Sequence, residues 1–319
     1  MKISVNHQII EISGQRTLLE ELRQAGLEIP SLCSDGENMH HASCMVCMVK
    51  DCQSGQMIPS CATRPREGME IETDSEEIRR LRRISLELLL SDHWADCEAP
   101  CTLVCPQGIP VDRVVYLYDL GLKAQAKALV GGKDCSQCTK RPCQKACRRG
   151  SVDKSVRIRD IIGELIHDTS LPQGDHPAES CDKTLFNSRI GRFTEPEKER
   201  MKQQYSQPSR CLHCACQGRD KCRLRQLASQ AGIKASRYGL SSQLPFKQEI
   251  HVNGRLWFEP AKCIRCGQCV YRTNNGFTFL GRGFGMQVII PEQNKANIDE
   301  QIAACCPTGA LYLKTEESC

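Results

Sequence analysis

Cysteine is the residue type whose number and spacing could do chemistry in this chain. The 319 residues include 23 cysteines, and nineteen of them fall into groups with metal-ligand spacing. Such groups indicate either disulfides made in an oxidising compartment or thiolates kept reduced for metal. The first residues, MKISVNHQ, contain no apolar signal segment, and no apolar run of about 18 residues predicts a membrane span. We therefore expect a cytoplasmic, metal-loaded protein.

The first cysteine group follows a segment with clear local signals. Residues 3–12 alternate as a β-hairpin, and Thr17 with Glu20 predicts a capping box on a helix that ends near Gly26. Four cysteines then follow at the spacing C-x10-C-x2-C-x13-C, namely Cys33, Cys44, Cys47 and Cys61. Three ligands on one loop and a fourth from a later segment favour a 2Fe–2S cluster, with zinc as the alternative.

On these residues, the first 75 or so positions resemble the plant-type ferredoxin domain that begins the large iron–sulfur subunit of complex I. They are also similar to the start of NAD-linked and iron-only hydrogenases. The resemblance implies a β-grasp 2Fe–2S domain over residues 1–75. Residues 76–90 predict a helix that leads to His93. The stretch RISLELLLSDHWADC resembles the complex I subunit again, and this implies that His93 ligates a 4Fe–4S cluster.

A second module is expected over residues 76–168. It contains H-x3-C-x3-C-x3-C from His93 to Cys105 and a second cysteine set from Cys135 to Cys147. Periodicity predicts one helix between them with Val111, Val115, Tyr118, Leu122, Ala126 and Leu129 on one face. A closing helix would turn Ile158, Ile161, Ile162 and Leu165 inward.

This second module resembles the helical double-cluster domain of the glutamate synthase small subunit and dihydropyrimidine dehydrogenase. The resemblance implies two 4Fe–4S clusters whose ligands cross over between the two sets. One would use His93, Cys97, Cys101 and Cys147; the other would use Cys105, Cys135, Cys138 and Cys143. The shifted spacing leaves this partition open.

The glutamate synthase family continues with a unit that binds FAD and NADPH, and this chain does not. Residues 169–205 are polar, charged and Pro-containing, which predicts a linker or an arm for a partner. No strand–GxGxxG–helix pattern occurs, and GRGFG at 281–285 is interpreted as a turn. We expect no flavin or NAD site in this chain.

Two further cysteine groups lie near the C-terminus. Residues 206–245 hold a compact set suited to a 4Fe–4S cluster or a structural zinc: Cys211, Cys214, Cys216 and Cys222. Residues 246–319 hold Cys263, Cys266 and Cys269 at C-x2-C-x2-C, but Thr273 stands where a two-cluster ferredoxin places its fourth cysteine. The fourth 4Fe–4S ligand is then expected at Cys306, with Cys305 as the alternative.

Short β-rich segments and a helix at 296–305 predict a small α+β ferredoxin-like domain. Together, these two groups resemble the C-terminal tail of some multi-cluster flavin oxidoreductases. No role is predicted for Cys52, Cys181 or Cys319.

The sequence therefore predicts an α+β multi-module electron-transfer subunit with one 2Fe–2S and three or four 4Fe–4S clusters. A net charge of +5 and basic residues beside cysteines suit negatively charged clusters better than nucleic acid. By resemblance, the partners are a flavoprotein that handles NAD(P)H and a catalytic subunit of hydrogenase, formate dehydrogenase or bifurcating type, in a hetero-oligomer. The alternatives are a self-contained redox enzyme and a zinc-based interaction scaffold.

Overall fold

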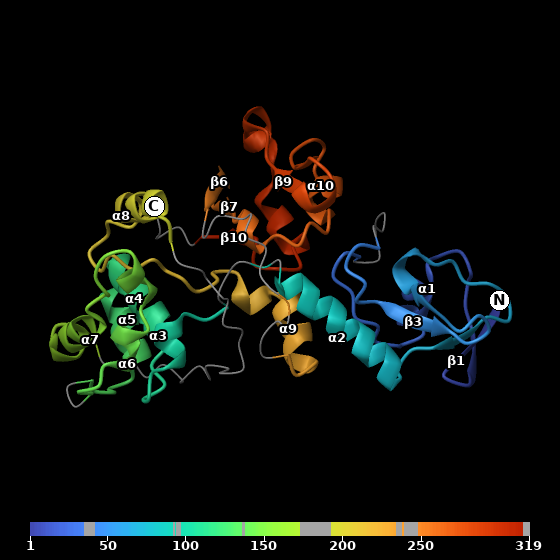
Figure 1. Cartoon of the computed structure of the whole chain (residues 1–319), viewed down its shortest axis with the longest axis horizontal. Helices are drawn as coiled ribbons and strands as arrows, with labels where there is room; N and C mark the ends of the chain where they lie inside the picture. Colours follow the sequence, from blue (N-terminus) through green and yellow to red (C-terminus); the bar gives the residue numbers. More distant parts are fainter. Residues whose placement is uncertain are drawn as a thin grey trace. The chain divides into compact units, whose positions relative to one another are not determined.

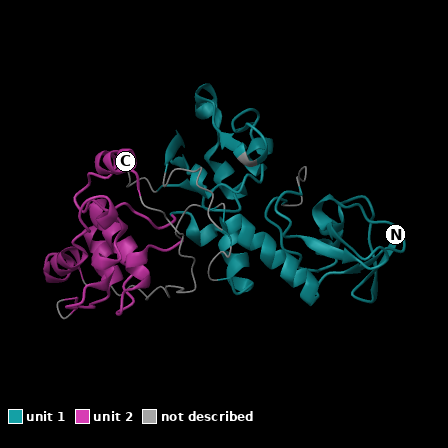
Figure 2. Cartoon of the chain, in the orientation of Figure 1, with its two compact units in different colours: residues 1–94, 217–314 teal, residues 95–216, 315–319 magenta. Residues whose placement is uncertain are grey.

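The computed structural model describes residues 1–34, 42–91, 93, 97–135, 138–172, 193–233, 238 and 248–314. The chain forms two compact units (Figure 2): unit 1 comprises residues 1–94 and 217–314, and unit 2 comprises residues 95–216 and 315–319. In sequence, unit 2 therefore interrupts unit 1, which the chain leaves after Trp94 and re-enters at Gln217. The five consecutive domains expected from the sequence stay a prediction.

The N-terminal part of unit 1 is a five-stranded sheet in the order β2-β1-β5-β3-β4 (Figure 1). Strands β1 and β2 pair antiparallel with Ile3 opposite Ile10, whereas β5 runs parallel to β1 and antiparallel to β3. Helix α1 buries Leu18, Leu19 and Leu22. The elements are β1 Lys2–Val5, β2 Gln8–Glu11, α1 Leu18–Gln24, β3 Met48–Asp51, β4 Gln56–Pro59, the 3₁₀ turn η1 Ser60–Ala62, and β5 Glu70–Glu72.

Local sequence signals explain these elements. Asn6 and His7 both adopt positive φ, as a two-residue hairpin turn requires. Thr17 and Glu20 form the expected capping box of α1, and Gly26 follows the helix with a φ of +84°. The predicted hairpin, cap and helix end are confirmed.

Two helices of unit 1 pack against each other although they are far apart in sequence. Helix α2 (Glu76–Ser91) buries Ile78, Leu86 and Leu90, and α9 (Arg223–Gln230) buries Leu224 and Ala228. The predicted helix before His93 is confirmed.

The C-terminal part of unit 1 is built from short strands and 3₁₀ turns. Its core includes Phe258 and Phe277, whose rings meet edge to face with centroids 5.8 Å apart. Strands β10, β7 and β6 form one sheet, and β8 pairs with β9. The elements are η3 Arg219–Lys221, β6 Ile250–Asn253, β7 Leu256–Phe258, η4 Pro260–Lys262, α10 Gln268–Arg272, β8 Thr278–Leu280, η5 Gly283–Gly285, β9 Gln287–Ile289, η6 Glu292–Asn297, η7 Glu300–Cys305 and β10 Leu311–Leu313. The segment predicted as a helix at 296–305 forms 3₁₀ turns instead.

The described part of unit 2 is helical. Its core includes Ile109, Val114, Ala126, Val130 and Leu165. The elements are α3 Pro100–Leu103, α4 Val111–Asp119, α5 Lys123–Val130, α6 Pro142–Lys145, η2 Arg148–Ser151, α7 Ile158–His167 and α8 Glu195–Gln204.

One prediction in unit 2 is wrong and one is confirmed. The single helix expected over 111–129 is two helices, because the chain breaks at Gly121, whose φ is +77°. The four inward residues predicted for the closing helix are all buried in α7. The linker expected at 169–205 lies largely outside the described residues, although α8 begins within it. Among the described helices, none combines the length and apolar character of a membrane span.

Candidate metal centres

The N-terminal cysteine set comes together in the structure. Cys33, Cys44, Cys47 and Cys61 are all buried. The thiols of Cys44 and Cys61 hydrogen bond with the Cys33 sulfur and lower its pKa, and the Cys61 thiol lowers the pKa of Cys47 to about 6. The same contacts raise the pKa values of Cys44 and Cys61. The four sulfurs are therefore linked to one another through S–H···S contacts, as the ligands of one cluster must be near neighbours.

Basic side chains fix the backbone around this set and place positive charge near it. The Arg23 guanidinium donates to the Ile29 carbonyl at 2.8 Å and to Ser31 Oγ at 2.7 Å, just before Cys33. Arg82 of α2 donates two bonds, of 3.1 and 2.7 Å, to the Met48 carbonyl, just after Cys47. Positive charge here would stabilise an anionic cluster.

In the C-terminal set, Cys263 follows η4, Cys266 lies between η4 and α10, Cys269 lies on α10, and Cys306 follows η7. Cys266 and Cys269 are buried, and burial together with neighbouring thiols raises the pKa values of both. Cys306 contributes more than Cys305 to the raised pKa values of both, and the two adjacent cysteines pack against the same core. The Cys263 sulfur accepts the backbone N–H of Arg265 at 3.4 Å.

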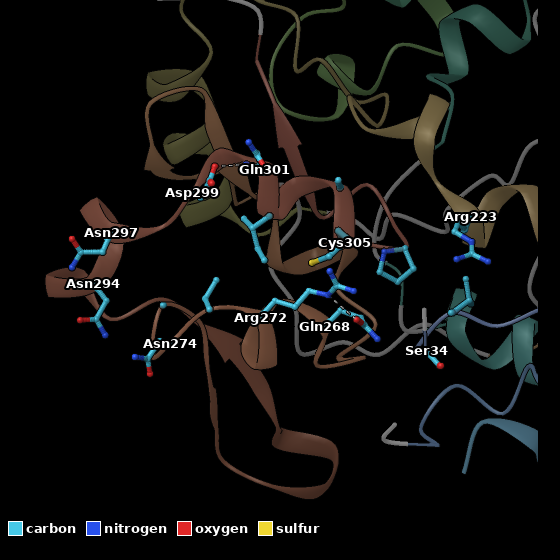
Figure 3. Close-up of a pocket in the computed structure, with 17 residues that line it drawn as sticks. Ser34, Arg223, Gln268, Arg272, Asn274, Asn294, Asn297, Asp299, Gln301 and Cys305 are labelled. Carbon is cyan, nitrogen blue, oxygen red and sulfur yellow. Dashed lines mark hydrogen bonds between the residues drawn. The ribbon is translucent and has the colours of Figure 1, made fainter. Parts of the chain in front are cut away.

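One side chain links the N-terminal and C-terminal sets within unit 1. Gln268 lies between Cys266 and Cys269 in sequence, and its Nε2 donates to the Cys33 carbonyl at 2.6 Å, in a buried position. Figure 3 shows Gln268 between Ser34 and Cys305 in a pocket of about 890 Å³ that Arg223 and Arg272 also line. Sequence reasoning missed this contact; the only signal was a long polar residue inside a ligand motif.

His93 belongs to unit 1 and is 5% exposed. Its Nε2 atom is buried without a hydrogen-bond partner among the described residues. Burial and the nearby charge of Lys262 lower the pKa of His93 to about 3, so its imidazole is neutral at physiological pH. A neutral imidazole with an uncommitted nitrogen fits the ligand role that the resemblance implies.

Unit 2 brings together the cysteines that were expected to hold one complete cluster. Burial raises the pKa of Cys135 to about 11, and the neighbouring groups that add to this are Cys105, Cys143 and Cys138. Burial likewise raises the pKa of Cys143, and Cys105 and Cys138 add to this. The four predicted side chains therefore lie near one another.

The compact C-terminal set is divided between the units. Cys211, Cys214 and Cys216 belong to unit 2, and Cys222 belongs to unit 1, where its sulfur accepts the Arg225 N–H at 3.4 Å. Within the described residues, no three His, Cys, Asp or Glu side chains are grouped as ligands of a single ion. Cys52 is exposed, whereas Cys181 and Cys319 lie outside the described residues.

Comparison with known protein families identifies the domain that carries the first cysteine set. Residues 1–76 match the family of 2Fe-2S iron-sulfur cluster binding domains. The predicted 2Fe–2S domain is thereby confirmed, and the mixed α+β architecture is confirmed with it.

Two similar proteins each match about a third of the chain. The mitochondrial NADH-ubiquinone oxidoreductase 78 kDa subunit of Candida albicans is 30% identical over 108 residues, which are 34% of this chain and 14% of that protein. NADP-reducing hydrogenase subunit HndD of Solidesulfovibrio fructosivorans is 34% identical over 110 residues, 33% of this chain and 18% of that protein. The match thus spans less than a fifth of either relative.

A solved structure of NAD+-reducing [NiFe]-hydrogenase in the H2-reduced state shares the fold. The TM-score is 0.53 at 18% identity, over 99% of this chain and 88% of that chain. The chain is therefore an iron–sulfur protein related to subunits of multi-subunit oxidoreductases, as is consistent with electron transfer.

Proposed function

We propose that this chain is the electron-transfer subunit of a cytoplasmic oxidoreductase complex and holds one 2Fe–2S and three or four 4Fe–4S clusters. Thiolate-held iron–sulfur clusters exchange single electrons at potentials that depend on hydrogen bonds, charge and solvent exposure. The observation that carries the proposal is the hydrogen bond from Gln268 to the carbonyl of Cys33. It joins two cysteine sets through one buried side chain.

We assign three ligand sets, and the mutual influence of their thiols supports them. The 2Fe–2S set is Cys33, Cys44, Cys47 and Cys61; the 4Fe–4S sets are Cys105, Cys135, Cys138 and Cys143, and Cys263, Cys266, Cys269 and Cys306. The chain buries all four sulfurs of the first set and, through Arg23 and Arg82, places positive charge beside them.

The partners are proposed from the relatives, which are subunits of larger oxidoreductases. We expect a flavoprotein that handles NAD(P)H on one side and a catalytic subunit of hydrogenase, formate dehydrogenase or bifurcating type on the other. Anaerobic affinity purification should recover both in a hetero-oligomer. Recovery of this chain alone, with activity towards a substrate, would favour a self-contained redox enzyme instead.

Metal analysis of anaerobically purified protein tests the cluster content. One 2Fe–2S cluster with three or four 4Fe–4S clusters predicts roughly 14 to 18 iron atoms per chain. The protein should be brown, and its visible absorption should bleach on reduction. A colourless protein with several zinc ions and little iron would contradict the proposal and favour a zinc-based scaffold.

A further inference from the structure

We propose that Cys101, Cys147, Cys211 and Cys214 of unit 2 together hold one 4Fe–4S cluster. This inference rests on the proposed iron–sulfur function and changes the ligand partition expected from the sequence. It takes two cysteines from the set implied for His93 and two from the compact set at 211–222. All four belong to unit 2 and to its described residues.

The first of the four is held by a buried polar contact. Cys101 lies on α3, and its neighbour Thr102 donates from Oγ1 to Asp112 Oδ1 at 2.5 Å and accepts the Asp112 N–H at 3.0 Å. Thr102 and Asp112 are both buried. Because Asp112 lies in the first turn of α4, this pair fixes α3, and Cys101 with it, against the start of α4.

The segment that carries Cys211 and Cys214 is fastened to the other end of α4. Ser209 donates from its backbone N–H (2.9 Å) and from Oγ (2.5 Å) to the two carboxylate oxygens of Asp119, and His213 Nε2 lies 3.1 Å from the same carboxylate. The Cys211 N–H donates to Ser209 Oγ at 2.9 Å. The His213 ring also meets Tyr116 edge to face, with centroids 5.2 Å apart.

Cys147 is tied to this same segment. Arg149, which is 2% exposed, donates to both carboxylate oxygens of Asp153 at 2.6 and 2.8 Å and to the Tyr205 carbonyl at 3.1 Å. Arg210 also donates to Asp153 Oδ2, at 3.1 Å. The turn after Cys147 and the turn before Cys211 are therefore joined through one buried guanidinium and one carboxylate.

Hydrogen bonds at the two ends of α4 hold the Cys101 and Cys211 segments against this helix, and Arg149 and Arg210 join the Cys147 turn to the Cys211 segment. Cys101, Cys147 and Cys211 all pack against the same hydrophobic core. Burial raises the pKa of the Cys101 thiol, and the ionisable groups that raise it further are, in decreasing order, Asp112, Cys211, Cys214 and Cys147. Three of the four are the cysteines named here. Separately, the Cys216 N–H donates to the Cys97 carbonyl at 3.3 Å.

The backbone turn that begins at Cys211 has the same geometry as the turn that begins at Cys263. In Cys211-Leu212-His213-Cys214, His213 has a φ of +45° and its N–H donates to the Cys211 sulfur at 3.3 Å. In Cys263-Ile264-Arg265-Cys266, Arg265 has a φ of +55° and its N–H donates to the Cys263 sulfur at 3.4 Å. Positive φ is uncommon for such residues, so the shared geometry indicates that both turns aim two sulfurs at one cluster.

Iron content and electron paramagnetic resonance of full-length protein, loaded anaerobically, test the ligand set. Alanine at each of the four positions should remove about 4 iron atoms and the same reduced-state signal. The double variant Cys101→Ala/Cys211→Ala should lose no more iron than either single variant, whereas Cys138→Ala/Cys211→Ala should lose about 8. The exposed Cys52→Ala should lose none, and retention of the 2Fe–2S signal of unit 1 in every variant reports intact folding.

The contrary results are distinct from failure of the proposed function. If Cys101→Ala/Cys211→Ala lost about 8 iron atoms, the two cysteines would serve different clusters and this ligand set would be wrong. An unchanged iron content in Cys214→Ala would also overturn it. In both cases the wild-type chain would still hold iron, whereas an iron-free wild-type chain would overturn the proposed function itself.

Discussion

The side-chain amide of Gln268 donates a 2.6 Å hydrogen bond to the backbone carbonyl of Cys33. The two residues are 235 positions apart, and each belongs to a different cysteine set. The bond is buried, so neither group can exchange its partner for bulk water. Within unit 1, the C-terminal ligand motif is therefore fixed directly to the first cysteine of the 2Fe–2S domain.

Replacement of this amide should affect both stability and redox properties. Gln268→Ala leaves the Cys33 carbonyl unsatisfied, and we expect a loss of about 1–3 kcal/mol in the free energy of unfolding. It also removes a positive dipole end beside the cluster, so the midpoint potential of the 2Fe–2S signal should fall. Anaerobic denaturation and a redox titration measure the two effects. Gln287→Ala, at an exposed position on β9, should change neither stability nor potential. If Gln268→Ala left the 2Fe–2S potential unchanged, the hydrogen bond to Cys33 would not influence the cluster.

Adjacent cysteines allow a matched test of the fourth C-terminal ligand. Cys306 contributes more than Cys305 to the raised pKa values of Cys266 and Cys269. The Cys306 sulfur also lies 3.5 Å from Thr308 Oγ1. Cys306→Ala should lose about 4 iron atoms, and Cys305→Ala should lose none. Iron analysis and the reduced-state spectrum of the two variants decide between them. The reverse pattern would transfer the ligand role to Cys305.

The sequence allowed reliable prediction where the signal was local. The hairpin turn at Asn6 and His7 and the cap at Thr17 depend on neighbouring residues alone, and both formed as expected. The grouping of Cys105 with Cys135, Cys138 and Cys143 came from a resemblance and stays a prediction, which the influence of these thiols on the pKa of Cys135 supports.

Long-range packing could not be read in the same way. The position of the segment before Cys211 depends on Asp119 and Arg149, whose contacts span 90 and 56 residues. Nothing in the spacing of the cysteines reports such contacts. The junction of residues 1–94 with 217–314 likewise depends on packing between α2 and α9, which have separate amphipathic patterns.

The ion pair between the buried Arg149 and the exposed Asp153 leads to a prediction about pH. Hydrogen bonds and charge from Arg149, with a further contribution from Arg210, lower the pKa of Asp153 to about 2. A carboxylate whose pKa is lowered in the folded state adds stability that is complete above its unfolded pKa, 3.8, and is lost as the pH falls towards 2. Asp153→Asn leaves the buried Arg149 guanidinium without its carboxylate partner, so it should cost about 1–3 kcal/mol, and this cost should be the same at every pH from 6 to 8.

Anaerobic urea denaturation across that pH range measures the effect. The matched control is Asp160→Asn, because Asp160 pairs with Arg157 at 3.7 Å on an exposed surface. That change should cost less than about 1 kcal/mol. A cost at Asp153 that varied between pH 6 and 8 would point to a different titrating group.

Two glycines of unit 2 should respond to alanine in opposite directions. Gly121 separates α4 from α5 with a φ of +77°, and an added Cβ would meet no atom within 4 Å. Gly163 lies within α7, where an added Cβ also meets nothing within 4 Å. Gly121→Ala should therefore destabilise unit 2 by about 1 kcal/mol through backbone strain, whereas Gly163→Ala should stabilise it by about 0.5–1 kcal/mol through helix propensity. An added Cβ meets no atom at either site, so steric clashes cannot explain a difference between the two variants. Opposite shifts in the thermal unfolding midpoint would therefore show that the positive φ of Gly121 separates the two helices. A stabilising Gly121→Ala would mean that the two helices can join.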